Sequence, residues 1–120
     1  MNLRAQGDSA ENQAVRLLTR KGHTIIARNY GRRGHGEIDI ISKDGDAYVF
    51  TEVKQRTGIR YGSAAEAVTP LKQRRVIETA MLWLAQNGLD DVAIRFDVIT
   101  VENEEMRHYE SAFDATDMEF

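Results

Sequence analysis

Residues 36–56 decide the fold of this chain and read GEIDIISKDGDAYVFTEVKQR. Apolar and charged residues alternate with a period of two on both sides of a central turn, which is typical of strands whose successive side chains face opposite sides of a sheet. Asp44-Gly45 and Gly45-Asp46 are both favoured two-residue hairpin loops. The stretch therefore predicts two antiparallel strands joined by a tight turn at one of these pairs.

The predicted hairpin brings two carboxylates to one face. A Gly45-Asp46 turn sets Asp39 directly opposite Glu52, an Asp44-Gly45 turn sets them diagonally, and in both registers their Cβ atoms lie roughly 5 to 8 Å apart. Like charges this close repel unless a proton or a cation lies between them. Mg²⁺ suits such a site, because it binds hard oxygen ligands and needs only one or two carboxylates. The predicted faces carry Glu37, Asp39 and Ile41 on the first strand, and Phe50, Glu52, Lys54 and Arg56 on the second.

The same residues resemble a nuclease signature. Asp39 followed by Glu52-Val53-Lys54 is similar to the PD-(D/E)xK motif of the restriction-endonuclease-like nucleases, although Glu37 and Ile38 stand where that motif has proline. A wider pattern, from about Gly7 to Phe113, resembles the YraN-like family of small bacterial predicted endonucleases, in which this departure is usual. The residues that carry the wider pattern are Arg28-Asn29-Tyr30, Gly36-Glu37-Ile38-Asp39, Phe50 to Arg56, Gly62 and Lys72.

The resemblance implies a metal-dependent hydrolase of phosphodiester bonds in DNA or RNA. Asp39 and Glu52 would hold Mg²⁺ or Mn²⁺, with the carbonyl of Val53 and the carboxylate of Glu11 completing the set of ligands. Lys54 would orient the attacking water or stabilise the charge that develops on the phosphate. Without the resemblance, Glu11 is explained as a favourable charge in the first turn of a helix.

The length of 120 residues and the apolar fraction of 42% are enough for one domain with one core. We predict a single nuclease-like domain over residues 1–120, with its core at about 7–113 and an acidic tail at 111–120. The chain has no cysteine, which excludes disulfides and thiolate zinc sites and fits a reducing compartment. No segment is apolar enough for a signal peptide or a bilayer span, so a cytoplasmic location is expected.

Charge is divided unevenly between the two halves of the chain, although the net charge is only −3. Residues 1–75 hold 14 of the 16 lysines and arginines against 8 acidic residues, whereas residues 76–120 hold 2 against 11. Solvated surface charge explains most such runs. Here the basic half also contains the paired carboxylates, and binding depends on the local field rather than on net charge. We therefore expect a nucleic-acid partner, with DNA favoured over RNA, and no membrane association.

Several residues of the basic half are candidates for contacts with nucleic acid. The glycine-arginine segment 31–36 either reaches a phosphate backbone or is only a hairpin tip. An aromatic residue in the segment that follows the hairpin either stacks on a base or is a buried anchor. A lysine in the first turn of the second helix lies where anions are attracted. The candidates are Arg32, Arg33, Arg56, Tyr61 and Lys72.

Helix and strand signals frame the hairpin. The elements predicted around it are a helix from Asp8 or Ser9 to about Lys21, a strand at 23–30, a helix from Pro70 to Asn87 capped by Thr69, and strands at 92–101 and 106–109. The chain is therefore predicted to be α/β, with a central mixed sheet flanked by two main helices, as in the restriction-endonuclease-like fold. His23 is expected at the surface, and Asp97 on the outer face of the sheet or paired with Arg95.

Two other classes of protein fit the same residues. One is a nuclease-like module that binds branched or single-stranded nucleic acid without cutting it, or that serves as a partner protein of a nucleic-acid-processing machine. The other is a structural protein in which Asp39, Glu52 and Lys54 form only a salt-bridge network. A pure binder has little use for negative charge where phosphate approaches. The carboxylates and the lysine together therefore favour the nuclease.

Overall fold

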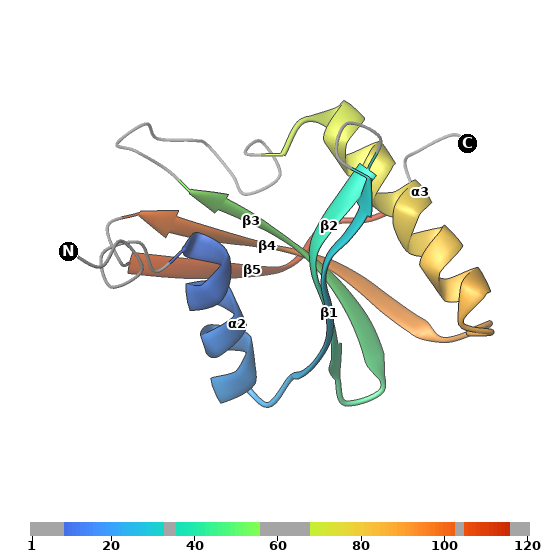
Figure 1. Ribbon diagram of the computed structural model, residues 1–120, viewed down its shortest axis with the longest axis horizontal. Helices are drawn as coiled ribbons and strands as arrows, with labels where there is room; N and C mark the ends of the chain where they lie inside the picture. The colour runs from blue at the N-terminus through green and yellow to red at the C-terminus, as the bar shows by residue number, and fades with distance from the viewer. Residues whose placement is uncertain (1–8, 33–35, 56–67, 103–104, 116–120) are drawn as a thin grey trace.

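The computed structural model describes residues 9–32, 36–55, 68–102 and 105–115. Its elements, labelled as in Figure 1, are α2 (Ala10–Arg20), β1 (Thr24–Arg32), β2 (Gly36–Asp44), β3 (Ala47–Gln55), α3 (Pro70–Gln86), β4 (Ala93–Glu102) and β5 (Glu105–Phe113). The predicted order of a helix, three strands, a helix and two strands is confirmed.

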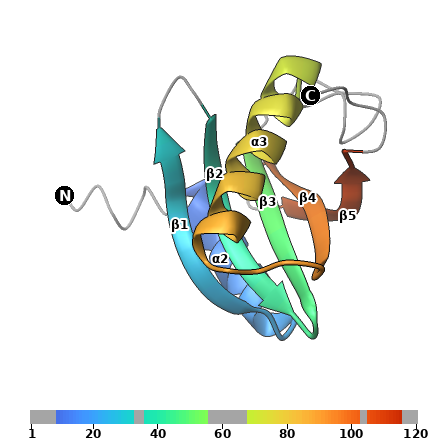
Figure 2. The same ribbon diagram turned by 90° about the vertical axis from the view of Figure 1, so that its right-hand side faces the viewer.

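The strands form one sheet in the order β1-β2-β3-β4-β5. β3 and β4 run parallel, and the other neighbouring pairs are antiparallel. α3 makes the crossover that a parallel pair requires. It covers one face of the sheet while α2 covers the other, as Figure 1 and Figure 2 show together. The predicted α/β class, with a mixed sheet between two helices, is confirmed.

Both helices begin at capping residues. The Ser9 hydroxyl accepts a hydrogen bond from the Asn12 N–H at 3.1 Å, and the Thr69 hydroxyl accepts one from the Lys72 N–H at 3.2 Å. Each cap satisfies one of the N–H groups that the first turn of a helix leaves unpaired. Of the two caps proposed for the first helix, Ser9 is the one used.

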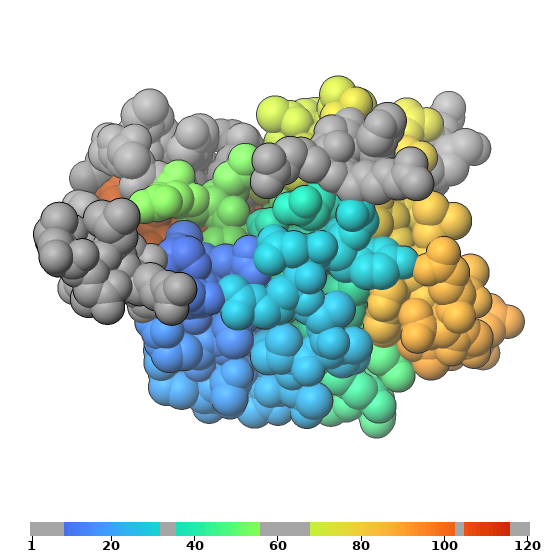
Figure 3. Space-filling model, in the orientation of Figure 1, coloured from blue at the N-terminus to red at the C-terminus, as the bar shows by residue number. Residues whose placement is uncertain are grey.

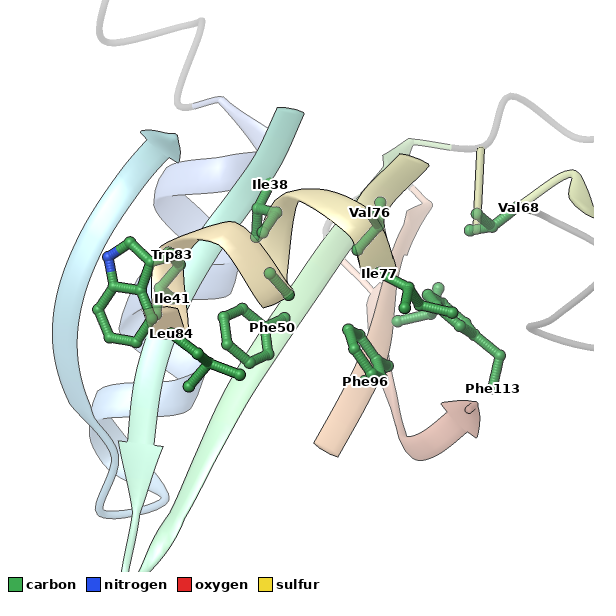
Figure 4. Packing of buried hydrophobic residues seen from close by; sticks show 12 residues of the cluster. Ile38, Ile41, Phe50, Val68, Val76, Ile77, Trp83, Leu84, Phe96 and Phe113 are labelled. Carbon is green, nitrogen blue, oxygen red and sulfur yellow. The ribbon is translucent and has the colours of Figure 1, made fainter. Parts of the chain in front are cut away.

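Two apolar cores lie on opposite faces of the sheet. The larger lies under α3 (Figure 4), where the ring of Phe50 is 5.5 Å from that of Phe96 and 5.9 Å from that of Trp83. Burying one such side chain contributes about 1.5–3 kcal/mol. β2 and β3 supply residues to both cores, so they are held from both sides. The buried residues of the smaller core, under α2, are Ala14, Leu18, Ile40, Ile99 and Val101.

The hairpin turns at Gly45-Asp46, because Asp44 pairs with Ala47. This is the register that was expected to set Asp39 opposite Glu52. The strict alternation predicted for the first strand is wrong, however. Ile38 packs with Ile41 under α3, whereas Ile40 packs under α2. The strand therefore changes face next to Asp39, where its ladder with β3 ends at the pair Ile40 and Thr51.

The glycines at the ends of the segment between β1 and β2 allow close approach within the protein itself. A Cβ at Gly31, whose φ is +114°, would collide with the carbonyl oxygen of Gly36. A Cβ at Gly36 would collide with the Thr79 hydroxyl of α3. These two glycines allow β1, β2 and α3 to pack closely together.

A polar network at the hairpin-turn end of the sheet corrects the prediction for His23 and selects between the two alternatives for Asp97. His23, expected at the surface, is 6% exposed, and its Nδ1 lies 2.9 Å from the Ser42 hydroxyl. Asp97 is fully buried, so an outer-face position is wrong, while the predicted pair with Arg95 is present at 2.9 Å. Burial keeps the pKa of His23 below its usual value. Both side chains face inward because hydrogen-bond partners are available there.

Among the described residues, neither helix is long and apolar enough to span a bilayer.

Candidate functional site

The candidate site lies at the end of the sheet away from the hairpin turn. Both helices run downward in Figure 1, so the N-terminal turns of α2 and α3 and the end of β3 lie toward the same side of the molecule. In Figure 3 the end of β3 (green) reaches the surface beside the start of α2 (dark blue). Asp39 and Glu52, which we call the carboxylate pair, lie where these elements meet, because Val53 of β3 donates to Asp39 and the charges of Glu11 and Lys72 act on it.

Asp39 is fixed by a hydrogen bond across the hairpin. Its Oδ2 accepts from the backbone N–H of Val53 at 2.7 Å. The carboxylate takes the place of a main-chain acceptor where the regular ladder with β3 has ended. Burial raises the pKa of Asp39 above its usual value, although the Val53 N–H and Lys72 act in the opposite direction.

Glu52 is a buried carboxyl group with one unsatisfied oxygen. The residue is 2% exposed, its Oε2 lies 3.6 Å from the Lys72 Nζ, and its Oε1 has no hydrogen-bond partner in the described part of the chain. Burial, and then the charge of Asp39, raise the pKa of Glu52 to about 8. A buried oxygen without a partner is costly. With a second carboxylate beside it, this oxygen has the chemistry of a ligand for a hard divalent cation.

Glu11 lies close enough to Asp39 for its charge to raise the pKa of that residue further. Its Oε1 accepts hydrogen bonds from Arg28 Nε at 2.8 Å and from the Asn29 side chain at 3.1 Å. Asn29 has a φ of +51°, and this left-handed turn lets two consecutive strand residues reach the same oxygen. The sequence pattern drew attention to Arg28 and Asn29 but did not assign them to Glu11.

The described residues contain no group of three or more acidic or histidine side chains that is compact enough to hold one metal ion. The structure therefore brings Asp39 and Glu52 together and leaves Glu11 beside them, tied to β1. A carboxylate pair is still sufficient for Mg²⁺, which usually keeps several water molecules and takes further ligands from its substrate.

Lys54 and Lys72 are placed differently. Lys54 follows Glu52 by two residues on β3 and is half-buried, and it forms neither a hydrogen bond nor an ion pair with other described residues. Lys72, predicted only as a phosphate contact, is the cation next to the carboxylate pair. Sequence spacing did not indicate this contact, because residue types do not show how α3 packs against the sheet that carries Glu52.

The remaining candidates are only partly described. The backbone of Arg32 ends β1 opposite Gly36. The side chain of Arg32 and all of Arg33, Arg56 and Tyr61 lie outside the described residues.

Comparison with known proteins places the chain in a family. The model of "Uncharacterised protein family UPF0102" matches residues 10–101. The UPF0102 protein of Symbiobacterium thermophilum is 50% identical over 99 residues, which are 82% of this chain and 83% of that protein. The UPF0102 protein YraN of Escherichia coli O8 is 45% identical over 109 residues, which are 89% of this chain and 82% of that protein.

The chain belongs to the UPF0102 family. The YraN-like resemblance is thus confirmed. Among solved structures, the UPF0102 chain is similar to Hjc of Archaeoglobus fulgidus, a Holliday junction resolvase, with a TM-score of 0.50 and 20% identity over 89% of this chain and 78% of Hjc. At this identity the likeness concerns the fold, and it confirms the restriction-endonuclease-like architecture.

Proposed function

We propose that this UPF0102 protein is a metal-dependent nuclease that hydrolyses phosphodiester bonds in DNA or RNA, with DNA favoured. The observation that carries the proposal is the unsatisfied, buried Oε1 of Glu52 next to Asp39. Burial and the charge of Asp39 make it costly to ionise Glu52, and carboxylates with such perturbed pKa values cluster at functional sites. Binding a divalent cation is the use that fits their oxygen chemistry.

The residues around the pair fit Mg²⁺ or Mn²⁺. Asp39 and Glu52 would supply carboxylate oxygens, and Glu11 an outer carboxylate. The N–H and C=O of one strand residue point to the same side of the strand. Because the Val53 N–H points to Asp39, the Val53 carbonyl faces that side as well and would add a neutral oxygen. The cation would lower the pKa of a bound water and neutralise developing negative charge.

Lysine side chains supply the positive charge that phosphate needs. Lys54 is free of partners among the described residues and lies on the strand that holds Glu52, so it is available to stabilise charge in the transition state. Arg32, Arg33, Arg56 and Tyr61 remain candidates for holding the substrate backbone and bases. The fold shared with a Holliday junction resolvase makes branched DNA the first substrate to test.

The test is a cleavage screen with linear, nicked, flapped and four-way DNA, and with matching RNA, in the presence of Mg²⁺ or Mn²⁺. We expect cleavage of at least one substrate by the wild type and its loss in Asp39→Asn and Glu52→Gln. Asp46→Asn is the matched control, because Asp46 is exposed at the other end of the same hairpin. Tight binding by the wild type without cleavage of any substrate would instead favour a non-catalytic nucleic-acid-binding module.

A further inference from the structure

Lys72 lies between the carboxylate pair and the solvent. Its Nζ lies 3.6 Å from the Oε2 of Glu52, which is 2% exposed, whereas the Lys72 side chain itself is 36% exposed. The lysine therefore approaches the buried carboxylate from outside rather than being enclosed with it. Its long stem allows the ammonium group to move away without a change in the backbone of α3.

The ammonium group and a divalent cation compete for the same carboxylates. The charge of Lys72 acts on both Asp39 and Glu52, so it partly compensates the buried pair in the metal-free protein. A metal ion bound to these oxygens would repel a lysine that stayed in place, since two positive charges a few ångströms apart repel even at high dielectric constant. Binding of the metal should therefore drive Lys72 outward.

A substrate phosphate near the start of α3 would be a second partner for the displaced lysine. Lys72 lies in the first turn of this helix, behind the cap at Thr69, and that turn contains no acidic residue. The N-terminal turn of a helix favours anions. A substrate phosphate near this turn would meet both the helix terminus and the released ammonium group.

We propose that Lys72 is an exchangeable counter-ion: it compensates the negative charge of the carboxylate pair when the site holds no metal, and it moves to a substrate phosphate when a divalent cation binds. The inference rests on the proposed function, and it adds that metal binding and nucleic-acid binding are coupled through this one side chain. Lys72 thus uses its two partners, the carboxylate pair and the substrate phosphate, in turn.

Two simpler roles for Lys72 predict other behaviour. A permanent salt bridge with Glu52 would affect stability but would leave nucleic-acid binding unchanged when Lys72 is replaced. A permanent phosphate contact would affect nucleic-acid binding but would leave metal affinity unchanged. The exchange predicts that removing the charge of Lys72 strengthens metal binding and weakens nucleic-acid binding.

The experiment measures both ligands with the variant Lys72→Met. Calorimetric titration with Mg²⁺ alone is done at pH 9, above the raised pKa of Glu52. A labelled DNA duplex is then titrated with and without Ca²⁺. We expect Lys72→Met to bind Mg²⁺ roughly tenfold more tightly or better, to bind DNA more weakly, and to lose most of the increase in DNA affinity that Ca²⁺ gives the wild type.

Two controls accompany the measurement. Arg20→Met removes an exposed positive charge at the far end of α2 and should leave both affinities unchanged. Lys72→Arg keeps the charge, so it should keep the metal affinity of the wild type, and its thermal melt shows whether position 72 tolerates replacement.

The outcomes separate the exchange from the nuclease proposal. Unchanged or weaker Mg²⁺ binding by Lys72→Met overturns the exchange, while the nuclease proposal stands if the wild type binds Mg²⁺ and Asp39→Asn does not. If the wild type binds no divalent cation, both proposals fail.

Discussion

Glu52 should make the metal-free protein less stable as the pH rises. The carboxyl group has a pKa of 4.5 in an unfolded chain and of about 8 in the folded protein. Between these values the folded state holds a proton that the unfolded state has released, so the free energy of unfolding falls as the pH rises from about 4.5 to about 8. The raised pKa of Asp39 acts in the same direction.

The corresponding prediction is that Glu52→Gln flattens this dependence. In buffer with EDTA, urea unfolding at pH 5 and at pH 8 should differ by on the order of a few kcal/mol less in the variant than in the wild type. Glu105→Gln is the control, because Glu105 is an exposed residue of β5. An equal pH dependence in Glu52→Gln and the wild type would contradict the buried, protonated state of Glu52.

Replacement of one side chain, Lys54, tests whether the protein is an enzyme. If Lys54 stabilises charge that develops only in the transition state, Lys54→Ala should lower the cleavage rate by on the order of a hundredfold or more, with substrate affinity close to that of the wild type. Single-turnover cleavage and equilibrium binding are measured on one preparation. A fall in affinity at an unchanged rate would instead make Lys54 a phosphate contact.

Asp97, on β4, links three strands of the sheet through its hydrogen bonds and through its partner Arg95. Its carboxylate accepts hydrogen bonds from three donors: Arg95 of the same strand, His108 Nε2 of β5 at 2.7 Å and the Ser111 N–H at 3.0 Å. Arg95 also contacts Asp44 at the end of β2. Burial alone would raise the pKa of Asp97, but the hydrogen bonds from His108, Arg95 and Ser111 outweigh it and lower the pKa below its usual value.

Asp97→Asn should therefore destabilise the fold by about 3–5 kcal/mol at neutral pH, the cost of breaking a buried ion pair on one side. The stabilising contribution of Asp97 is present above its unfolded pKa of 3.8 and is lost as the pH falls through the lower folded value. Unfolding of the two proteins should converge in acid. A difference that stayed constant down to acid pH would show that the change acts through packing rather than charge.

The division of charge is a property of the whole molecule. The basic half of the sequence supplies α2, the hairpin and the start of α3, and Lys72 of this half lies next to the carboxylate pair. Charge reversal at Arg32 and Arg33 should weaken DNA binding and reduce the slope of log affinity against log salt by about 0.7–0.9 for each phosphate that the protein no longer neutralises. Reversal at Arg107, an exposed residue of β5, should change the slope less. Equal changes for both sets would refute a basic binding face.

Residue types and spacing alone determined the hairpin, the Thr69 cap of the second helix and the placing of Asp39 and Glu52 on one face. These features follow from rules that act over a few residues: strand alternation, turn chemistry and capping. The carboxylate pair could be predicted because a two-residue turn fixes which residues of a hairpin oppose each other.

Only the tertiary structure decided the surroundings of that pair. The contact of Lys72 with Glu52, the tie from Arg28 and Asn29 to Glu11, and the burial of His23 each join elements that local rules do not relate. Their positions depend on how two helices pack on opposite faces of the sheet. The change of face next to Asp39 has the same origin, because Ile38 and Ile40 serve two different cores. Periodicity cannot show such a change, since it arises from three-dimensional packing rather than from residue spacing.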